Sequence, residues 1–366
     1  MDFIPIEYYT ASYFYFLLII TLLIFAQSLH SDLSTISNIK FKSVLGYILL
    51  ILLILYMGLR PISFAFGDMG IYFKEFNEYV AGKPFDKSKD YLFEYIKFFF
   101  AKTNSPETFF FVCTLLYVLP LYFVCRKLFV DYWFYGFFIL ISSFSFWAYG
   151  VNGIRNGIGT SLFLFAITRE RFAFRIALLI TTILFHKSLI VPVVAYFIAT
   201  NYRQVKFYFY CWLLAIPISF VLGGFWESFF LGFDFGETKL DNYLGEFDAA
   251  NEGVEVKVGF RLDFIFYSAT GVFAAWYYLF KQKYQDRFYL DLVRMYLTVN
   301  AFWILIIRAN YSNRFAYLSW FMLGLIIIYP LLKVKLLKNQ HRIVGRILLF
   351  YFIFTFILCV IFVKDA

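Results

Sequence analysis

Long apolar runs follow one another along almost the whole sequence, and they constrain the fold more than any other feature. Several approach or exceed the roughly 20 residues that a helix needs to cross a hydrocarbon core of about 30 Å. Hydrophobic residues make up 62% of the 366 residues, and charged residues only 16%. A water-soluble core could not bury this much apolar surface. The sequence therefore predicts an all-α, polytopic integral membrane protein.

About twelve of these runs are expected to form transmembrane helices, with both chain termini on the outer side. The runs cover residues 12–29, 43–59, 106–125, 132–149, 158–168 with the break before it, 172–187, 188–200, 207–222, 262–280, 289–307, 315–332 and 346–363. Dividing the long run 172–200 into two keeps the short basic connections on one side, as the positive-inside rule requires. These connections include 30–42, 126–131, 169–175, 201–206 and 333–346.

The remaining features favour a single transmembrane domain over residues 1–366, with long outer loops at 60–105 and 223–261. Both loops mix aromatic and charged residues, which is typical of partly buried or interfacial segments. The basic inside connections account for the net charge of +9, so nucleic acid is not expected as a partner. The four cysteines and three histidines show no metal-ligand spacing, and neither a metal nor a cofactor is predicted.

Ionisable residues near the outer ends of the spans are the candidate functional residues. A charge within a membrane is costly unless it lines a cavity or has a partner, so such residues mark sites. Because they are expected on one side, they predict one polar site at the outer face. They are Arg60, Asp68, Arg155, His186, Lys187, Arg261, Asp263, Arg308 and Arg314.

Arg155 lies in a glycine-rich break, GVNGIRNG over residues 150–157, between two apolar runs. Glycines can expose backbone amides as an anion-binding nest, and a helix that resumes at Ile158 would add its positive N-terminal end. The planar fork of the arginine suits phosphate. The alternative is an arginine at a loop tip that extends to the lipid headgroups.

Two residues could accept a proton from a substrate. His186, in FHKSLIVP over residues 185–192, could act as a general base near neutral pH, and Lys187 beside it could bind phosphate. Asp68 lies between glycines in AFGDMGIY. The alternatives are a buried histidine bonded to a neighbouring helix and an aspartate that only stabilises a turn.

Further charged residues flank the outer turns. Arg308 and Arg314 flank the segment ANYSN, whose polar side chains are typical of a pocket rim. Arg261 is a further candidate, and the alternative for it is a simple ion pair with Asp263. There is no P-loop, dinucleotide-binding glycine motif, nucleophile elbow or D-x-D motif, so arginine rather than metal would handle phosphate. Three glutamates of the first outer loop are expected on a charged amphipathic surface: Glu75, Glu78 and Glu94.

The order of these motifs resembles the EpsG-like group of bacterial polysaccharide polymerases, which includes the Wzy O-antigen and capsule repeat-unit polymerases. The resemblance covers about residues 45–335 and rests on GDMGIY, a segment with glutamates, NGIRN, FHKSLIVP, RLDF and NRFAY, in that order. The chain departs from the commoner family pattern at Asn156, where glutamine usually follows the arginine. It also lacks the usual Gly-Thr pair before Asp68.

The resemblance implies a GT-C-like, all-helical glycosyltransferase of the bacterial inner membrane, with long periplasmic loops and a site facing the periplasm. It would move a growing glycan from undecaprenyl pyrophosphate to a new lipid-linked repeat unit. The partners implied are these lipid-linked oligosaccharides, membrane lipids and a chain-length regulator. His186 or Asp68 would deprotonate the acceptor hydroxyl. The residues that would hold the pyrophosphate are Arg155, Arg308, Arg314, Arg60, Arg261 and Lys187.

Two other functions stay open. A flippase of the same lipid-linked unit would also need cationic sites, although no two-half repeat is evident and the polar residues gather on one side. An O-antigen ligase, or an acyltransferase built on a membrane histidine, would share most of these sequence features.

Overall fold

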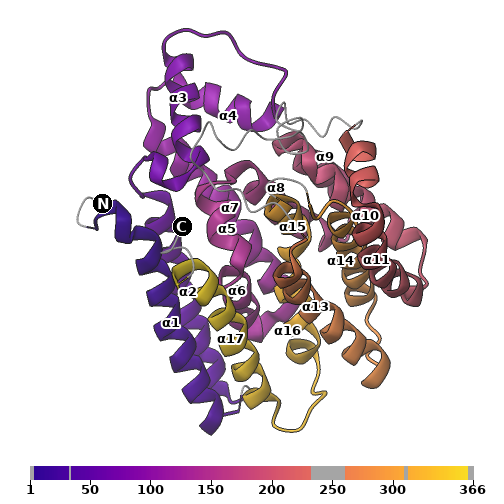
Figure 1. The fold of residues 1–366 in the computed structure, drawn as a ribbon. Coiled ribbons are helices and arrows are strands. Elements are labelled where there is room, and N and C mark those ends of the chain that lie inside the picture. The colour runs from indigo at the N-terminus through magenta and orange to yellow at the C-terminus, as the bar shows by residue number, and fades with distance from the viewer. Residues whose placement is uncertain (1–3, 33, 232–259, 309–311, 362–366) are drawn as a thin grey trace. The chain divides into compact units, whose positions relative to one another are not determined.

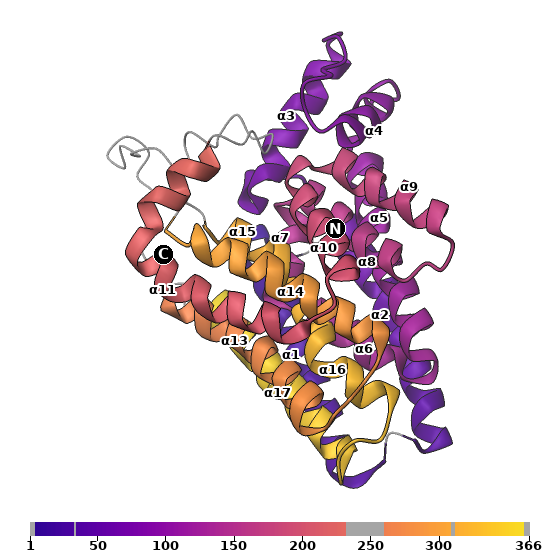
Figure 2. The ribbon, with the colours of Figure 1, turned by 90° about the vertical axis from the view of Figure 1, so that its right-hand side faces the viewer.

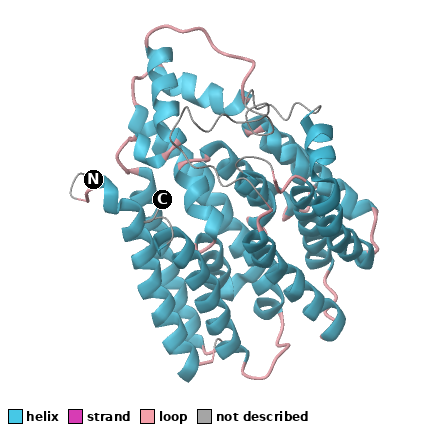
Figure 3. Ribbon diagram, viewed as in Figure 1, coloured by secondary structure: helices cyan, strands magenta, loops and turns pink. Residues whose placement is uncertain are grey.

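The computed structural model describes residues 4–32, 34–231, 260–308 and 312–361, and its regular structure within these ranges is helical throughout (Figures 1 and 3). Most of the predicted outer loop 223–261 lies outside the described residues. Among those described, 7 helical segments are long and apolar enough to cross a membrane. The protein is therefore an all-α, polytopic membrane protein, as predicted.

The predicted count of twelve spans is not supported. The seven long segments are accompanied by three shorter apolar helices, Ile154–Ile167, Phe172–Phe185 and Lys187–Asn201. The run 132–149 is also broken at Ser142 and Ser143 into two short helices. Hydropathy locates apolar runs, but it does not show where a helix breaks within one. The seven long segments are Ile6–His30, Ile36–Gly58, Pro106–Ile141, Val205–Trp226, Arg287–Leu305, Asn313–Lys333 and Gln340–Ile361.

The chain forms two compact units, residues 1–186 with 331–366 and residues 187–330. The elements of the first unit are α1 (Ile6–His30), α2 (Ile36–Gly58), η1 (Phe64–Phe66), α3 (Asp68–Val80), α4 (Tyr91–Ala101), α5 (Pro106–Phe129), η2 (Val130–Tyr132), α6 (Trp133–Ile141), α7 (Phe144–Val151), α8 (Ile154–Ile167), α9 (Phe172–Phe185), α17 (Gln340–Phe356) and η6 (Ile357–Ile361). Those of the second are η3 (Lys187–Leu189), α10 (Ile190–Asn201), α11 (Val205–Leu231), α13 (Leu262–Trp276), η5 (Tyr277–Lys281), α14 (Arg287–Leu305), α15 (Ser312–Trp320) and most of α16 (Leu323–Lys333).

In the first unit, α1 packs along α17, and α5 packs against both α2 and α8 (Figure 1). The contact between α1 and α17 is close, because a Cβ added to Gly345 would lie 2.0 Å from Ser28 Oγ. Small residues allow such close helix approach in membranes. Aromatic pairs fill the interior beside these contacts, including Tyr13 stacked on Trp147 at 4.4 Å between ring centroids.

Four of the predicted inside connections meet at one end of the first unit, where α17 begins. Lys127 pairs with Glu170 at 2.8 Å, and Lys333 donates to Leu128 O at 3.0 Å. His341 Nδ1 lies 3.6 Å from Asp32. The connections 30–42, 126–131, 169–175 and 333–346 therefore share what we call the α17 end, as the charge pattern predicted. The other end, which carries α3 and α4, is called the α3 end (Figure 1).

The helices α3 and α4 are joined by a buried charge network. Lys97 is 0% exposed and pairs with Glu75 and with Glu94, at 2.7 Å for the latter. Tyr79 donates to Glu94 at 2.7 Å. The surface location predicted for Glu94 is therefore wrong, because Lys97 supplies the countercharge that allows its carboxylate to be buried. Glu78, with a side chain 39% exposed, does lie at the surface.

The second unit is arranged around α14, which contacts α10, α11, α13 and α15 (Figure 2). Asn300 on α14 is fully buried, accepts a hydrogen bond from Trp212 at 2.7 Å and donates to Ser268 and Ser319. Arg294, also on α14, donates to Ala199 O and pairs with Asp291 at 3.0 Å. Polar side chains with partners of this kind hold membrane helices together.

Candidate functional site

One carboxylate oxygen at the α3 end of the first unit contacts two residues that the sequence singled out. Asp90 Oδ2 lies 2.7 Å from Arg155 Nη1 and 2.8 Å from His186 Nδ1. Asp90 is 3% exposed and His186 only 1%. Asp90 therefore joins Arg155 and His186, which are separated along the chain, into one cluster.

Tyr72 completes this group, which we call the Asp90 cluster: Tyr72, Asp90, Arg155 and His186. Arg155 Nε donates to Tyr72 Oη at 3.3 Å, and its guanidinium carbon lies 5.5 Å from the centre of the Tyr72 ring. The Arg155 side chain is 26% exposed, in contrast to its buried partners. Arg155 is thus the member of the cluster that a ligand can reach.

Local structure explains why these four residues meet. Asp90 stands at the N-cap of α4, where aspartate is favoured, but its side chain makes no capping bond and contacts Arg155 and His186 instead. Arg155 lies in the first turn of α8, and His186 is the extended residue that ends α9. Since α8 and α9 pack together as an antiparallel hairpin, its open end carries both residues.

Asp68 is placed beside the start of the glycine-rich break. Its backbone amide donates to Asn152 Oδ1 at 2.8 Å. The preceding Gly67 has a φ of +64°, and a Cβ there would lie 2.6 Å from the Asn152 side chain. Glycine is required at position 67 on both grounds. Asp68 itself is the half-buried first residue of α3.

Four backbone amides of the glycine-rich break are already engaged within the protein. The amides of Asn152, Gly153, Ile154 and Gly157 all donate to nearby backbone carbonyls. The role of Gly157 is steric, because a Cβ on it would lie 2.6 Å from the carbonyl oxygen of Tyr149. The break thus allows α7 and α8 to approach closely, and it contributes the Arg155 side chain to the site.

Arg60 forms no hydrogen bond or ion pair with the residues of the Asp90 cluster. It is 4% exposed, donates to Met57 O, and lies 6.0 Å and 5.9 Å from the ring centres of Phe66 and Phe110. Burial lowers the pKa of Arg60 to about 10. Its two other guanidinium nitrogens are buried without a hydrogen-bond partner. The structure thus gives Arg60 an aromatic, enclosed environment rather than an accessible phosphate site.

The other predicted phosphate ligands belong to the second unit. Arg261 pairs with Asp263 at 2.6 Å, which is the simple pairing considered as its alternative. Arg308 donates to Phe220 O at 3.1 Å. Arg314 is a half-buried residue of α15, and Lys187 begins η3. Their phosphate-binding roles stay predictions.

Sequence reasoning missed Asp90 and Tyr72. Asp90 lies in the polar stretch DKSKDYLFEY, and the signal that could have marked it is its place directly before an apolar helix, which is typical of an N-cap. Tyr72 is the last residue of the GDMGIY motif, and the sequence gives no separate signal for its contact with Arg155. Asp90 and Tyr72 belong to the site through contacts with residues at least 65 positions away in the sequence, such as the contact between Asp90 and Arg155.

The Asp90 cluster offers a positive group held by a buried carboxylate. An arginine fixed in this way can bind an anion and stabilise developing negative charge, while a histidine bonded to a carboxylate has a defined tautomer and orientation. Among the described residues, no group of three or more histidine, cysteine, aspartate or glutamate side chains could hold a metal ion.

Comparisons with known proteins agree with the family suggested by the motifs. No curated protein and no solved structure gives a significant match. The sequence model of the EpsG family, a family of Wzy-like polymerases, matches residues 43–366. This match includes all four residues of the Asp90 cluster and nearly all of the predicted membrane-spanning runs. On this evidence the chain belongs to the EpsG family.

Proposed function

We propose that this protein is a polysaccharide polymerase, a metal-independent glycosyltransferase of O-antigen or capsule synthesis. It moves a growing glycan from undecaprenyl pyrophosphate onto a new lipid-linked repeat unit. The observation that carries the proposal is the Asp90 cluster, in which the partly exposed Arg155 is held by a buried carboxylate at one end of the first unit. Membership of a family of Wzy-like polymerases supports the same reaction.

In the proposed reaction, the acceptor hydroxyl oxygen forms a bond to the anomeric carbon of the donor sugar. The bond from that carbon to the pyrophosphate oxygen breaks, and undecaprenyl pyrophosphate leaves with the electron pair. Arg155 stabilises the negative charge on the leaving pyrophosphate, so no metal is needed. Asp90 and Tyr72 orient the guanidinium through Nη1 and Nε. In this scheme the predicted phosphate roles of Arg308, Arg314 and Lys187 supplement Arg155.

The acceptor proton needs a base, and burial favours Asp68 over His186. A base must come within hydrogen-bond reach of the hydroxyl. Asp68 is half-buried next to the break that contains Arg155, whereas His186 is 1% exposed and already bonded to Asp90. We therefore assign the base to Asp68 and propose that His186 positions Asp90 and, through it, Arg155.

Complementation of a strain that lacks its polymerase tests these roles. Arg155→Ala and Asp68→Asn are expected to abolish long glycan ladders while the protein is still made. His186→Gln should slow chain growth only roughly tenfold, the effect of losing one orienting hydrogen bond of about 1.4 kcal/mol, without altering the pH profile. Normal ladders with Arg155→Ala would contradict the proposal. An altered pH profile with His186→Gln would return the base role to His186.

The same gel separates the alternative functions. Loss of a polymerase leaves a single repeat unit on the lipid core, whereas loss of a flippase or of an O-antigen ligase leaves none. A GT-C-like architecture, a place in the bacterial inner membrane and a site that faces the periplasm follow from the proposed function. A chain-length regulator is the protein partner that the proposal implies.

A further inference from the structure

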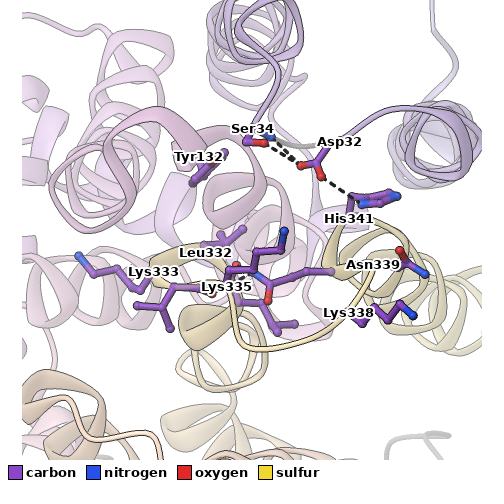
Figure 4. Close-up of a pocket in the computed structure, with 12 residues that line it drawn as sticks. Asp32, Ser34, Tyr132, Leu332, Lys333, Lys335, Lys338, Asn339 and His341 are labelled. Carbon is purple, nitrogen blue, oxygen red and sulfur yellow. Dashed lines mark hydrogen bonds and ion pairs between the residues drawn. The ribbon is translucent and has the colours of Figure 1, made fainter.

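A second polar cavity lies at the α17 end of the first unit, opposite the Asp90 cluster. It has a volume of about 330 Å³ and is formed by Asp32 and Ser34 between α1 and α2, by Tyr132, and by the loop between α16 and α17 (Figure 4). Its lining includes Lys333, Lys335, Lys338 and His341, against the single carboxylate of Asp32. The cavity is therefore positively charged.

Two of these lysines are available to a ligand. Lys335 and Lys338 are exposed and form no hydrogen bond or ion pair with any described residue. One carboxylate cannot offset both lysines. The charge of Lys335 acts on Asp32, but Asp32 Oδ1 accepts from the amide and the hydroxyl of Ser34 at 3.0 and 2.9 Å, and its Oδ2 faces His341 (Figure 4). An anion in the cavity would supply the missing countercharge.

The loop that carries Lys335 and Lys338 is held in a fixed shape by Gln340. Its Oε1 accepts from the amides of Leu336 and Leu337 at 2.8 and 3.1 Å, and its Nε2 donates to the carbonyls of Leu331 and Val334. The loop then enters α17 through Asn339, which has a left-handed φ of 54°. This local structure preorganises the cavity and distinguishes it from a scatter of surface lysines.

The position of the cavity identifies the source of the anion. It lies where α1 ends at His30, α2 begins at Ile36, α16 ends at Lys333 and α17 begins at Gln340, next to three segments long and apolar enough to span a membrane and the end of a fourth. This level corresponds to the lipid headgroups, where basic pockets between helices bind anionic lipids. Apolar lining from Tyr132, Leu332 and Val334 suits the glycerol and the upper part of the acyl chains.

We propose that this cavity binds the phosphate headgroup of an anionic phospholipid from the leaflet at the α17 end. Lys335 and Lys338 contact the phosphate, and Gln340 holds the loop that presents them. The site is separate from the Asp90 cluster and does not depend on the polymerase reaction.

Lipid binding to the full-length, delipidated protein in detergent tests the proposal. Native mass spectrometry would follow added phosphatidylglycerol, with phosphatidylcholine as the neutral lipid. We expect Lys335→Ala/Lys338→Ala to weaken phosphatidylglycerol binding roughly tenfold, because each lysine near an anionic lipid adds substantially to affinity. Gln340→Ala should also weaken binding although it changes no charge. Arg203→Ala/Lys206→Ala, which removes two exposed charges elsewhere, is the matched control and should bind as the wild type does.

The outcomes are distinct. Equal binding by the lysine variant and the control, or equal binding of the two lipids, would overturn the proposal. Displacement of phosphatidylglycerol by millimolar inorganic phosphate would assign the cavity to free phosphate and overturn the lipid assignment. Lys335→Arg/Lys338→Arg keeps both charges and should retain binding. The melting temperature of the alanine variant without lipid shows whether it folds, and an unchanged value would exclude misfolding as the cause of weaker binding.

Discussion

Asp90 is the residue on which the candidate site depends, since one of its oxygens contacts both Arg155 and His186. The side chain of its acidic neighbour Asp86 accepts from the amide and the hydroxyl of Ser88 at 2.9 and 2.6 Å, and it lies near the charges of Lys89 and Lys83. The two aspartates are 4 positions apart in the sequence and differ almost entirely in their surroundings. This contrast makes them a matched pair for mutagenesis.

Asp90→Asn is expected to lower chain growth by roughly 10- to 100-fold, because the buried pair with Arg155 loses its charge and Arg155 loses its fixed orientation. The measurement is glycan ladder formation per unit of membrane-inserted protein. Asp86→Asn should leave the ladder unchanged. Equal ladders from the two variants would mean that Asp90 does not position the reactive arginine.

At the scale of elements, α3 and α4 depend on Lys97, which bridges Glu75 and Glu94 without any exposure to solvent. Burial raises the pKa of Glu75, but the Lys97 charge and the hydrogen bonds from Lys89 and Lys97 outweigh it and hold this pKa below its ordinary value. Glu75 thus contributes stability above the ordinary glutamate pKa of about 4.3, and this contribution is lost as the pH falls through the folded-state pKa.

Lys97→Met leaves the buried carboxylate of Glu94 without its countercharge, whereas the half-buried Glu75 keeps its pair with Lys89. The substitution should reduce stability by about 3–5 kcal/mol. Thermal unfolding in detergent at pH 7 and at lower pH measures this. The wild type should lose stability as the pH falls below about 4, and the variant should lose less, because Glu75 no longer has the Lys97 charge that helps to lower its pKa. Lys83→Met removes the exposed pair with Glu78 and is expected to change little. Equal effects of the two substitutions would show that the buried network is not stabilising.

The close approach of α7 and α8 gives a second prediction at this scale. Gly157→Ala places a Cβ 2.6 Å from a backbone oxygen of Tyr149, which cannot move aside as a side chain could. The expected loss is about 1–3 kcal/mol, seen as a lower melting temperature together with weaker activity, since Arg155 shares this turn. Gly224→Ala, where a Cβ would meet nothing within 4 Å, is the control. An unchanged melting temperature for Gly157→Ala would contradict the packing described.

The sequence predicted more of the helices and their connections than of the candidate site. Apolar runs and loop charges predicted the helices and the connections that share the α17 end, because both depend on local composition. Arg155 and His186 were also recognisable as ionisable residues next to apolar runs. Asp90 was not, because its burial follows from contacts with residues 65 and 96 positions away. The glycines of the break did not distinguish exposed amides from close packing, and the structure shows close packing at Gly157.

For the whole molecule, the arrangement of the first unit predicts which residues share a side of the membrane. Lys87 belongs to the α3 end and Ser34 to the α17 end, and both are exposed. In a background with Cys211→Ser and Cys359→Ser, an impermeant maleimide added to spheroplasts should label Lys87→Cys directly. It should label Ser34→Cys only after the membrane is permeabilised. Cys113 and Cys125 are buried and should stay unlabelled. Labelling of both cysteines in sealed spheroplasts would contradict the arrangement, whereas labelling of Ser34→Cys alone would reverse the proposed orientation in the membrane.

The hairpin of α8 and α9 has a consequence for the surrounding lipid. Each helix has 14 residues and so measures only about 21 Å, yet the hairpin runs from the Asp90 cluster to Glu170 beside Lys127. The hydrocarbon layer is about 30 Å thick. The hairpin therefore imposes hydrophobic mismatch: either the bilayer thins locally, or Arg155 and His186 are recessed below the level of the neighbouring headgroups. If the proposed function holds, a pyrophosphate carried on a lipid chain would meet Arg155 at a depression in the membrane surface in both cases.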